Sequence, residues 1–246
     1  MMTNDSINIA ICDDLEEERE KLKSYINEYL DINELVAEID EFESGEAFLS
    51  TDTKKYNLVV LDIFMGELNG METARKLIKE NRSTQIIFYS TSYEYAAESY
   101  DVSALYYLVK PAKKEKAFEV LDKFFSAYMS LKTITVKVGR AEENIYISDI
   151  ISVESNNHKA IIHTKDGDIE ASMQLSKLEE MLLPYDFVKP LRYALVSLKE
   201  ITAIPTDVVT LSDGTVYSVS RKEREKVKQA FNDYKWKVMF GKGREQ

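Results

Sequence analysis

The first half of this 246-residue chain alternates short apolar runs with amphipathic segments, and this alternation limits the possible folds more than any other feature. Strand-like runs occupy residues 7–12, 36–42, 58–62, 85–90 and 104–109. Helix-like segments occupy residues 15–30, 45–49, 70–81, 93–100 and 112–131. Apolar strands that alternate with helices are typical of a parallel sheet covered on both faces. We therefore predict an α/β domain with a five-stranded, doubly wound parallel sheet over residues 1–129.

The second half consists mainly of short runs rich in β-branched residues. They occupy residues 133–138, 144–147, 150–155, 160–164, 169–172, 186–190, 195–198, 200–204, 208–211 and 216–220. Glycine-containing turn signals at residues 166–168 and 213–214 lie between neighbouring runs, as in β-hairpins. Helix-like segments occur near residues 174–183 and 221–234. We predict a mostly antiparallel β domain over residues 133–240.

The charge of the chain is unevenly distributed. The net charge is −11, yet residues 1–129 carry −12 and residues 130–246 carry +1. The second half can therefore approach a polyanion if its basic residues gather on one face. The chain has one cysteine, Cys12, and no apolar run of the roughly 18–20 residues that a membrane span needs. We expect a cytoplasmic protein without a disulfide or membrane segment.

Carboxylates follow two strands of the predicted sheet. Asp13 and Asp14 come directly after the first strand, and Asp62 ends the third. Because ligands bind at the carboxyl ends of parallel strands, all three carboxylates are expected at one edge. Three carboxylates so close together repel one another unless a cation neutralises them. Oxygen ligands of this kind suit Mg²⁺.

Two further polar residues reach the same edge. Lys110 ends the fifth strand and supplies a positive charge for a phosphoryl oxygen, and Ser90 ends the fourth strand and supplies a hydroxyl. A metal, a carboxylate nucleophile, an ammonium group and a hydroxyl are the parts that phosphoryl transfer to Asp62 requires. Each piece alone also fits an ordinary loop or helix cap, so the prediction depends on their joint placement.

The segments ICDD (11–14), LDIFM…NG (61–70), Ser90-Thr91 and YYLVKP (106–111) resemble the receiver domain of bacterial two-component response regulators, which has a flavodoxin-like fold. The resemblance implies that a sensor histidine kinase phosphorylates Asp62. It also implies that Asp13, Asp14, Asp62 and the main-chain carbonyl of Phe64 hold Mg²⁺.

The same resemblance implies further features of the site. Ser90 and Tyr107 would form a switch pair, in which Tyr107 swings inward, and the Lys110–Pro111 peptide bond would be cis. Receivers of this kind dimerise through their fourth and fifth helices, here residues 93–100 and 112–131, so we expect a homodimer on phosphorylation. One departure is Gly66, which stands where the family usually has proline.

Residues 133–235 resemble the LytTR DNA-binding domain, in which loops rather than a recognition helix enter the DNA grooves. The matching segments are residues 149–164, 175–183, 186–201 and 216–227. By this resemblance the base-reading candidates are His158, Arg192 and Arg221, with Asn157 beside them, and the phosphate candidates are Lys159, Lys189, Lys222 and Arg224. For any single lysine, a solvated loop charge is an equally good interpretation. Lys235, Lys237, Lys242 and Arg244 of the tail add nonspecific contacts or form a frayed terminus.

The leading hypothesis is a transcription regulator, not an enzyme, that binds double-stranded DNA as a dimer when Asp62 is phosphorylated. One alternative is a phosphorelay or adaptor protein whose β module binds protein, which would show no salt-dependent DNA binding. A metal-dependent phosphatase is a second alternative. It would show multiple turnover on small phosphates, but it leaves the β module without a role.

Overall fold

The computed structural model describes residues 7–240, apart from the side chains of residues 237, 239 and 240. The chain divides into two compact units, with the break between Phe125 and Ser126. Among the described residues, no helix combines the length and the apolar character that a membrane crossing needs.

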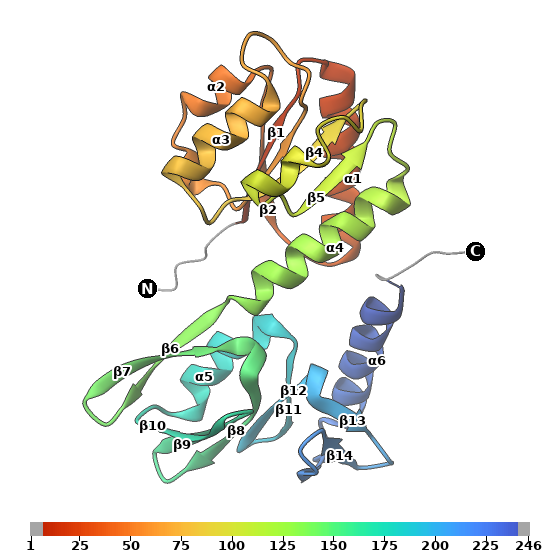
Figure 1. Cartoon of the computed structure of the whole chain (residues 1–246). Coiled ribbons are helices and arrows are strands. Elements are labelled where there is room, and N and C mark those ends of the chain that lie inside the picture. Colours follow the sequence, from red (N-terminus) through yellow and green to blue (C-terminus); the bar gives the residue numbers. More distant parts are fainter. Residues whose placement is uncertain (1–6, 241–246) are drawn as a thin grey trace. The chain divides into compact units, whose positions relative to one another are not determined.

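The first unit contains a five-stranded parallel sheet, as predicted (Figure 1). Its strands are β1 (Ile7–Cys12), β2 (Ala37–Phe42), β3 (Leu58–Leu61), β4 (Gln85–Ser90) and β5 (Tyr106–Val109). The strand order β2-β1-β3-β4-β5 places β1 and β3 side by side, where the order of the strands reverses. This is the position at which an open α/β sheet binds its ligands.

Helices cover both faces of this sheet. They are α1 (Glu16–Ile32), α2 (Gly45–Leu49), α3 (Gly70–Glu80) and α4 (Lys114–Ser130), with short 3₁₀ turns η1 (Thr53–Lys55) and η2 (Glu98–Val102). Side chains of α2 and α3, such as Phe48 and Leu77, share one hydrophobic cluster with strand residues. On α1, the Tyr29 ring lies 5.3 Å from Phe125 of α4, and its hydroxyl donates to Asp122 at 2.7 Å.

The helix predicted over residues 93–100 is wrong. The segment forms turns that lead into η2, and Ser103 ends it in the left-handed region with φ 52°. Its sequence offers little apolar surface for a helix to bury, since Tyr93 is 74% and Tyr100 is 83% exposed. The Ser99 hydroxyl also donates to the Ala96 carbonyl at 2.7 Å, a local bond that competes with regular helix.

The second unit is built from antiparallel strands, as predicted, and every strand pair described in it is antiparallel. A five-stranded sheet has the order β10-β9-β8-β12-β11, a three-stranded sheet has the order β13-β14-β15, and β6 pairs with β7. The strands are β6 (Thr133–Val138), β7 (Ala141–Tyr146), β8 (Ile150–Asn156), β9 (Lys159–Thr164), β10 (Gly167–Ala171), β11 (Phe187–Leu191), β12 (Ala194–Ser197), β13 (Ile201–Ala203), β14 (Val208–Leu211) and β15 (Val216–Ser218). Two α-helices, α5 (Leu175–Leu182) and α6 (Arg224–Phe240), and the 3₁₀ turns η3 (Ile147–Asp149), η4 (Leu183–Tyr185) and η5 (Leu198–Glu200) complete it.

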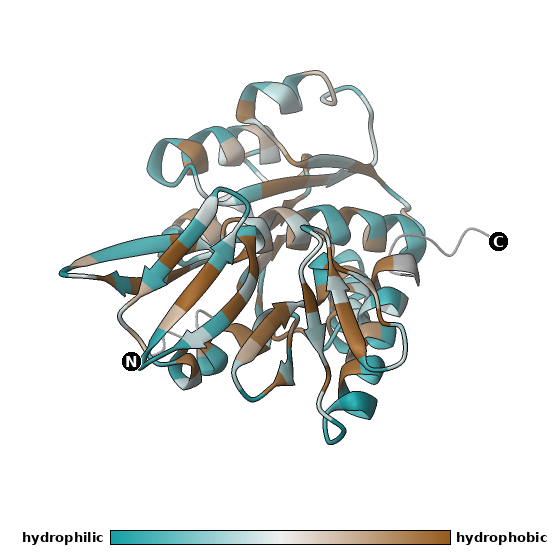
Figure 2. Cartoon of the chain, turned by 90° about the horizontal axis from the view of Figure 1, so that it is seen from below, coloured by the Kyte–Doolittle hydropathy of each residue, from teal (hydrophilic) through white to brown (hydrophobic). Residues whose placement is uncertain are grey.

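Both faces of the five-stranded sheet in this unit are buried. Because successive strand residues point to opposite faces, Ile150 and Ile151 enter two different hydrophobic clusters. One cluster includes residues of β6, β7 and α5, and the other includes residues of β13, β14, β15 and α6. Figure 2 shows the same pattern, with hydrophobic strand residues and hydrophilic hairpin tips. The tips are therefore free to serve as contact loops.

Candidate functional site

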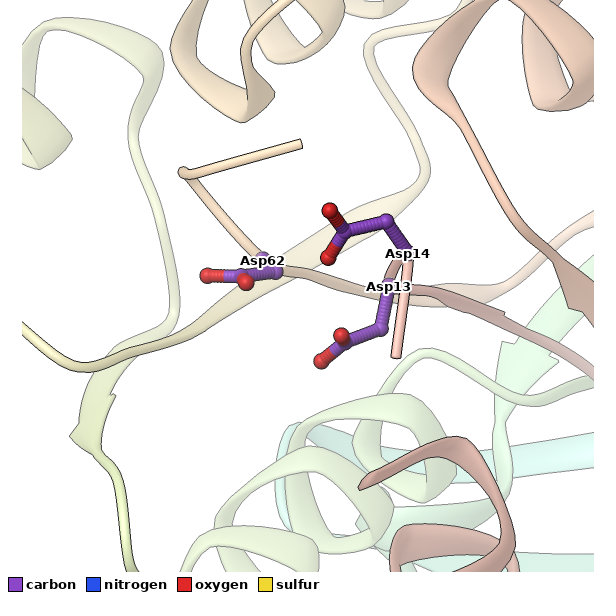
Figure 3. A group of neighbouring side chains, drawn as sticks. All are labelled: Asp13, Asp14 and Asp62. Atoms are coloured by element: carbon purple, nitrogen blue, oxygen red, sulfur yellow. The ribbon is translucent and has the colours of Figure 1, made fainter. Parts of the chain in front are cut away.

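Three carboxylates come together at the carboxyl edge of the parallel sheet. Asp13 and Asp14 follow β1, Asp62 follows β3, and one oxygen from each lies within 4.8 Å of the others (Figure 3). Asp13 and Asp62 are only 1% and 4% exposed, whereas Asp14 faces solvent. The parallel pairing of β1 with β3 produces this convergence, because it ends the two strands at the same level. The donor set is made only of oxygen atoms and fits a hard divalent cation such as Mg²⁺.

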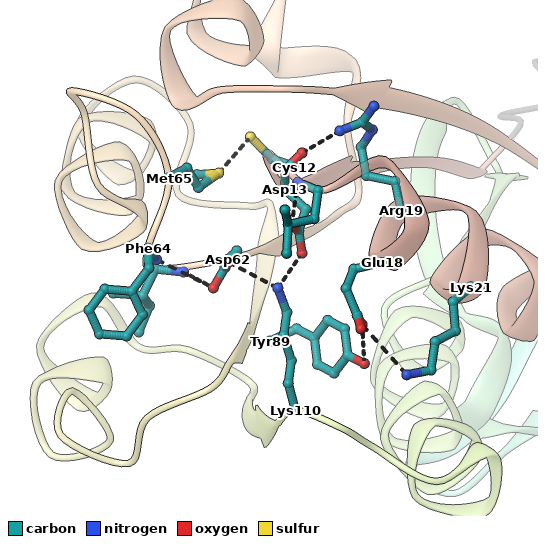
Figure 4. Close-up of polar contacts among 12 residues, drawn as sticks. Cys12, Asp13, Glu18, Arg19, Lys21, Asp62, Phe64, Met65, Tyr89 and Lys110 are labelled. Atoms are coloured by element: carbon teal, nitrogen blue, oxygen red, sulfur yellow. Dashed lines mark hydrogen bonds and ion pairs between the residues drawn. The ribbon is translucent and has the colours of Figure 1, made fainter.

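Lys110, the residue after β5, bridges the two buried carboxylates (Figure 4). Its Nζ donates to Asp13 Oδ2 at 2.5 Å and to Asp62 Oδ2 at 2.9 Å. Burial raises the pKa of Asp13, and the hydrogen bond from Lys110 offsets this only in part. Burial also disfavours the ammonium, but its bonds to the two carboxylates outweigh that effect and raise the pKa of Lys110. The ammonium thus supplies a positive charge between the two acids.

The second carboxylate oxygen of Asp62 is held by the main chain. Its Oδ1 accepts from the amide of Ile63 at 2.6 Å and from that of Phe64 at 3.3 Å. These bonds fix the orientation of the carboxylate. The main-chain carbonyl of Phe64, predicted to complete the metal site, belongs to this same turn, and its role as a ligand stays a prediction.

The helix that follows Asp62 approaches very closely. Asn69 caps α3 by accepting from the Glu72 amide at 2.9 Å, and the amide of Gly70 donates to the Ile63 carbonyl at 3.0 Å. A Cβ atom at Gly70 would lie 2.0 Å from the main-chain oxygen of Asp62. Only glycine fits this approach, so the start of α3 is tied to the end of β3.

Gly66, where the receiver family usually has proline, has φ +42°. Proline fixes φ near −65° and cannot adopt this conformation. The loop between β3 and α3 is therefore built on a left-handed residue, and the departure from the family pattern has a conformational reason. The Lys110–Pro111 peptide bond is cis, as predicted.

Ser90 and Tyr107 lie on the neighbouring strands β4 and β5. Ser90 is fully buried, and its Oγ has no hydrogen-bond partner among the described residues. Tyr107 is partly buried, and its hydroxyl donates to the carbonyl of Ser92 at 2.5 Å. Burial, followed by the negative charge of Asp62, raises the pKa of Tyr107. A free buried hydroxyl on Ser90 is the donor that an incoming phosphoryl oxygen would satisfy.

In the second unit, three predicted contact loops gather at one end of the five-stranded sheet. The β8–β9 hairpin turns at Asn157 and His158, both with positive φ, and the β11–β12 hairpin turns at Arg192. The amide of Ser155 donates to the carbonyl of Tyr193 at 2.8 Å, which joins the two hairpins. The amide of Ser220 donates to the Pro190 carbonyl at 3.0 Å and so brings Arg221 and Lys222 to the same end.

The basic candidates in these loops fall into two groups. Lys159, Lys189 and Arg224 form ion pairs with Glu170, Glu179 and Asp207, respectively. Among the described residues, no ion pair is formed by the exposed side chains of Arg192, Arg221 and Lys222. The second group is therefore immediately available to an anion, whereas the first must exchange partners. Of the tail lysines and arginines, Lys235 lies on α6, the side chain of Lys237 is not described, and Lys242 and Arg244 lie outside the described residues.

Two family models match the chain, one in each half. The family model of the response regulator receiver domain matches residues 9–122, and that of the LytTr DNA-binding domain matches residues 143–232. Together they account for more than four fifths of the chain. The chain belongs to the LytTR response regulators. The predicted family and the predicted combination of domains are thus confirmed.

Individual relatives of this LytTR response regulator are regulatory proteins. Sensory transduction protein LytR of Staphylococcus epidermidis is 29% identical over 228 residues, which cover 81% of this chain and 90% of the relative. Sensory transduction protein LytT of Bacillus subtilis is 26% identical over 209 residues, covering 78% and 87%. Among solved structures, the response regulator TrrA of Thermotoga maritima in complex with Mg²⁺-BeF has 29% identity and a TM-score of 0.43, and the match covers 48% of this chain and 98% of that one.

Sequence reasoning missed part of the surroundings of the receiver site in this LytTR regulator. Arg19 of α1 donates to the main-chain oxygen of Asp13 at 2.7 Å, and the Asp13 side chain accepts from the Leu15 amide at 3.0 Å. The sequence indicates Tyr89 only as part of an apolar strand, yet its ring faces Lys110. The arginine carried no signal in the sequence, whereas a tyrosine directly before the Ser90 strand end was a polar residue in an otherwise apolar run.

Proposed function

We propose that this LytTR regulator accepts a phosphoryl group on Asp62 from a sensor histidine kinase, and that phosphorylation increases its dimerisation and its affinity for double-stranded DNA. The observation that carries the proposal is the buried pair Asp13 and Asp62, bridged by Lys110 at the carboxyl edge of the sheet. We assign residues 1–129 to the receiver and residues 133–240 to the DNA-binding domain. Both functions place the protein in the cytoplasm.

In the transfer step, an oxygen of the Asp62 carboxylate attacks the phosphorus of a phosphohistidine. The new O–P bond forms as the P–N bond breaks, and the bonding electron pair leaves with the imidazole nitrogen, which takes up a proton. When bound by Asp13, Asp14, Asp62 and the Phe64 carbonyl, Mg²⁺ would neutralise charge on the phosphoryl oxygens. Lys110 exchanges its bond to Asp62 for one to a phosphoryl oxygen, and Ser90 donates its free hydroxyl to another.

The transferred group adds about −1.5 to −2 charges next to Lys110. Ser90 and Tyr107 transmit the effect of this added charge to the rest of the unit, since they lie on the two strands that end beside the site. The expected dimer face contains residues 93–100, where Tyr93 and Tyr100 are exposed, and residues 112–131, which include α4. Two linked copies on one DNA offset the weak affinity of a domain with little net charge.

In the DNA-binding domain, Arg192 and Arg221 are the principal base-reading candidates, and Lys222 is the principal phosphate candidate. Their support is that they are exposed, form no ion pair within the part of the chain that the structure describes, and gather at one end of the sheet. His158 and Asn157 form the adjacent tight turn. Lys159, Lys189 and Arg224 contribute after they leave their carboxylate partners.

The experiment is selection of bound sequences from random DNA with and without acetyl phosphate and Mg²⁺, followed by affinity measurements at several salt concentrations. We expect an enriched sequence, a steep fall of affinity with salt, and a gain on addition of phosphodonor that Asp62→Ala abolishes. Arg221→Ala should relax the sequence preference. Absence of salt-dependent DNA binding would favour the adaptor alternative. Multiple turnover on small phosphates would favour the phosphatase alternative.

A further inference from the structure

Lys110 has a third neighbour besides its two carboxylates. The ring of Tyr89, on β4, lies with its centroid 5.1 Å from the Lys110 Nζ, within the range of a cation–π contact (Figure 4). Tyr89 is 1% exposed, so this contact forms in a place from which water is excluded. The ammonium is therefore enclosed by two acids and by the face of an aromatic ring.

The ring of Tyr89 is itself anchored. Its hydroxyl donates to Glu18 Oε2 at 2.8 Å, and Glu18 also lies 3.6 Å from the ammonium of Lys21. Glu18 belongs to the first turn of α1, the helix that begins two residues after Asp14. Burial, followed by the hydrogen bond to Glu18, raises the pKa of Tyr89, so the phenol stays neutral and keeps its proton for this bond.

A lysine at a phosphorylation site needs such a constraint. Its side chain is a flexible four-carbon stem that ends in a compact charge, and nothing in its own covalent structure fixes where the charge points. When Asp62 carries a phosphoryl group, Lys110 loses one of its carboxylate bonds and must settle on a phosphoryl oxygen. A rigid ring beside the ammonium limits the positions that it can take during this exchange.

We propose that Tyr89, anchored by Glu18, is a positioning residue that holds the Lys110 ammonium where it binds the phosphoryl group on Asp62. The inference rests on the proposed function of Asp62. It adds a physical link between the first turn of α1 and the charge at the site. Tyr89 touches neither the phosphoryl donor nor the metal, and it acts only through Lys110.

The chain contains a matched control. Tyr56 is 2% exposed, its hydroxyl donates to Asp40 at 2.6 Å, and Lys55 Nζ lies 4.8 Å from its ring centroid. Tyr56 and Tyr89 thus share burial, a hydroxyl–carboxylate bond and a lysine neighbour. Only Tyr89 has a lysine that contacts Asp62. Replacing either by leucine removes the same groups from the receiver, so a general loss of packing should affect both variants.

The test measures two affinities of the full chain: that of Mg²⁺ alone, and that of beryllofluoride, a phosphoryl mimic, at saturating Mg²⁺. Tyr89→Leu is expected to weaken beryllofluoride binding by about five-fold or more, on the scale of a desolvated cation–π contact, with Mg²⁺ affinity changed less than about two-fold. Tyr89→Phe keeps the ring but loses the bond to Glu18, and Glu18→Ala removes the same bond from the other side, so both should show an intermediate loss. Tyr56→Leu should leave both affinities near those of the wild type.

Wild-type beryllofluoride affinity in Tyr89→Leu, or an equal loss in Tyr56→Leu, would overturn the positioning role. If Tyr89→Leu does not fold, Tyr89→Phe and Glu18→Ala decide: the role is refuted if both bind beryllofluoride as the wild type does. Failure of the wild type itself to bind beryllofluoride with Mg²⁺ would instead refute the proposed function of Asp62. The two failures are therefore distinguishable in one set of measurements.

Discussion

Replacing Lys110 by methionine should destabilise the first unit strongly, and Mg²⁺ should reverse much of the loss. Methionine has a similar length and no charge, so the substitution removes the ammonium from between Asp13 and Asp62. The side chains of these acids are 1% and 5% exposed, and that of Lys110 is 5% exposed. Removing one partner of a buried ion pair costs about 3–5 kcal/mol, because the remaining charge has no compensation.

Protonation sets an upper limit on this loss. The variant can take up a proton on Asp13, whose pKa burial already raises. Holding that proton at pH 7 costs about 1.4 kcal/mol for each unit above the ordinary pKa of about 4, or roughly 4 kcal/mol in all. We therefore expect a loss of about 3–4 kcal/mol at pH 7. Because the folded carboxyl then binds a proton that the unfolded one has released, stability is lost as pH rises through the raised pKa and is regained as pH falls toward 4.

Alkylation of the single cysteine provides an assay for this unit alone. Cys12 lies in β1 and is fully buried, so its thiol reacts only when the unit opens. The alkylation rate is measured over a urea series in EDTA and again in excess Mg²⁺. Mg²⁺ at a concentration of 100 Kd raises the free energy of unfolding by about 2.7 kcal/mol. Lys55→Met is the control, since its ion pair with Asp40 is exposed and contributes less than about 1 kcal/mol. The reasoning is refuted if Lys110→Met lowers the free energy of unfolding no more than Lys55→Met does, or if Mg²⁺ does not reduce the loss.

Three further predictions concern other parts of the chain. Burial raises the pKa of Cys12 to about 12, so native protein at pH 8 should react with a thiol reagent far more slowly than unfolded protein does. Gly70→Ala should destabilise the first unit by about 2 kcal/mol or more, measured by the same alkylation assay, because its Cβ would lie 2.0 Å from a main-chain oxygen. Glu179→Gln frees Lys189 and should raise DNA affinity and steepen its salt dependence by up to about one unit of slope. Glu180→Gln is the control, because Lys189 pairs with Glu179, and it should change neither quantity.

Much of the receiver site could be predicted because its residues stand at the ends of strands. Asp13, Asp62 and Lys110 each follow an apolar run, and parallel pairing brings the ends of such runs to one edge. Two features depend on side-chain rotamers, which no sequence pattern specifies. They are the bridge that Lys110 makes between Asp13 and Asp62 and the hydrogen bonds that Asp62 Oδ1 accepts from main-chain amides. The Tyr89 contact was missed for the same reason.

Other differences arise where local preference and tertiary packing compete. Residues 93–100 contain two alanines and two glutamates and look helical, but Tyr93 and Tyr100 are exposed and only Tyr95 packs against the core, so the segment forms turns. In the second unit, the strand runs were predictable from β-branched residues, whereas the pairing of Lys159, Lys189 and Arg224 with carboxylates was not. Their partners lie on other elements, at sequence separations that the topology decides.

The most direct test of the account is to locate the phosphoryl group after the full chain is incubated with acetyl phosphate and Mg²⁺. Reduction of the acyl phosphate with borohydride followed by peptide mass spectrometry identifies the modified residue. We expect modification at Asp62, lost without Mg²⁺ and strongly reduced in Lys110→Met. Modification at another carboxylate, or equal modification in EDTA, would contradict it.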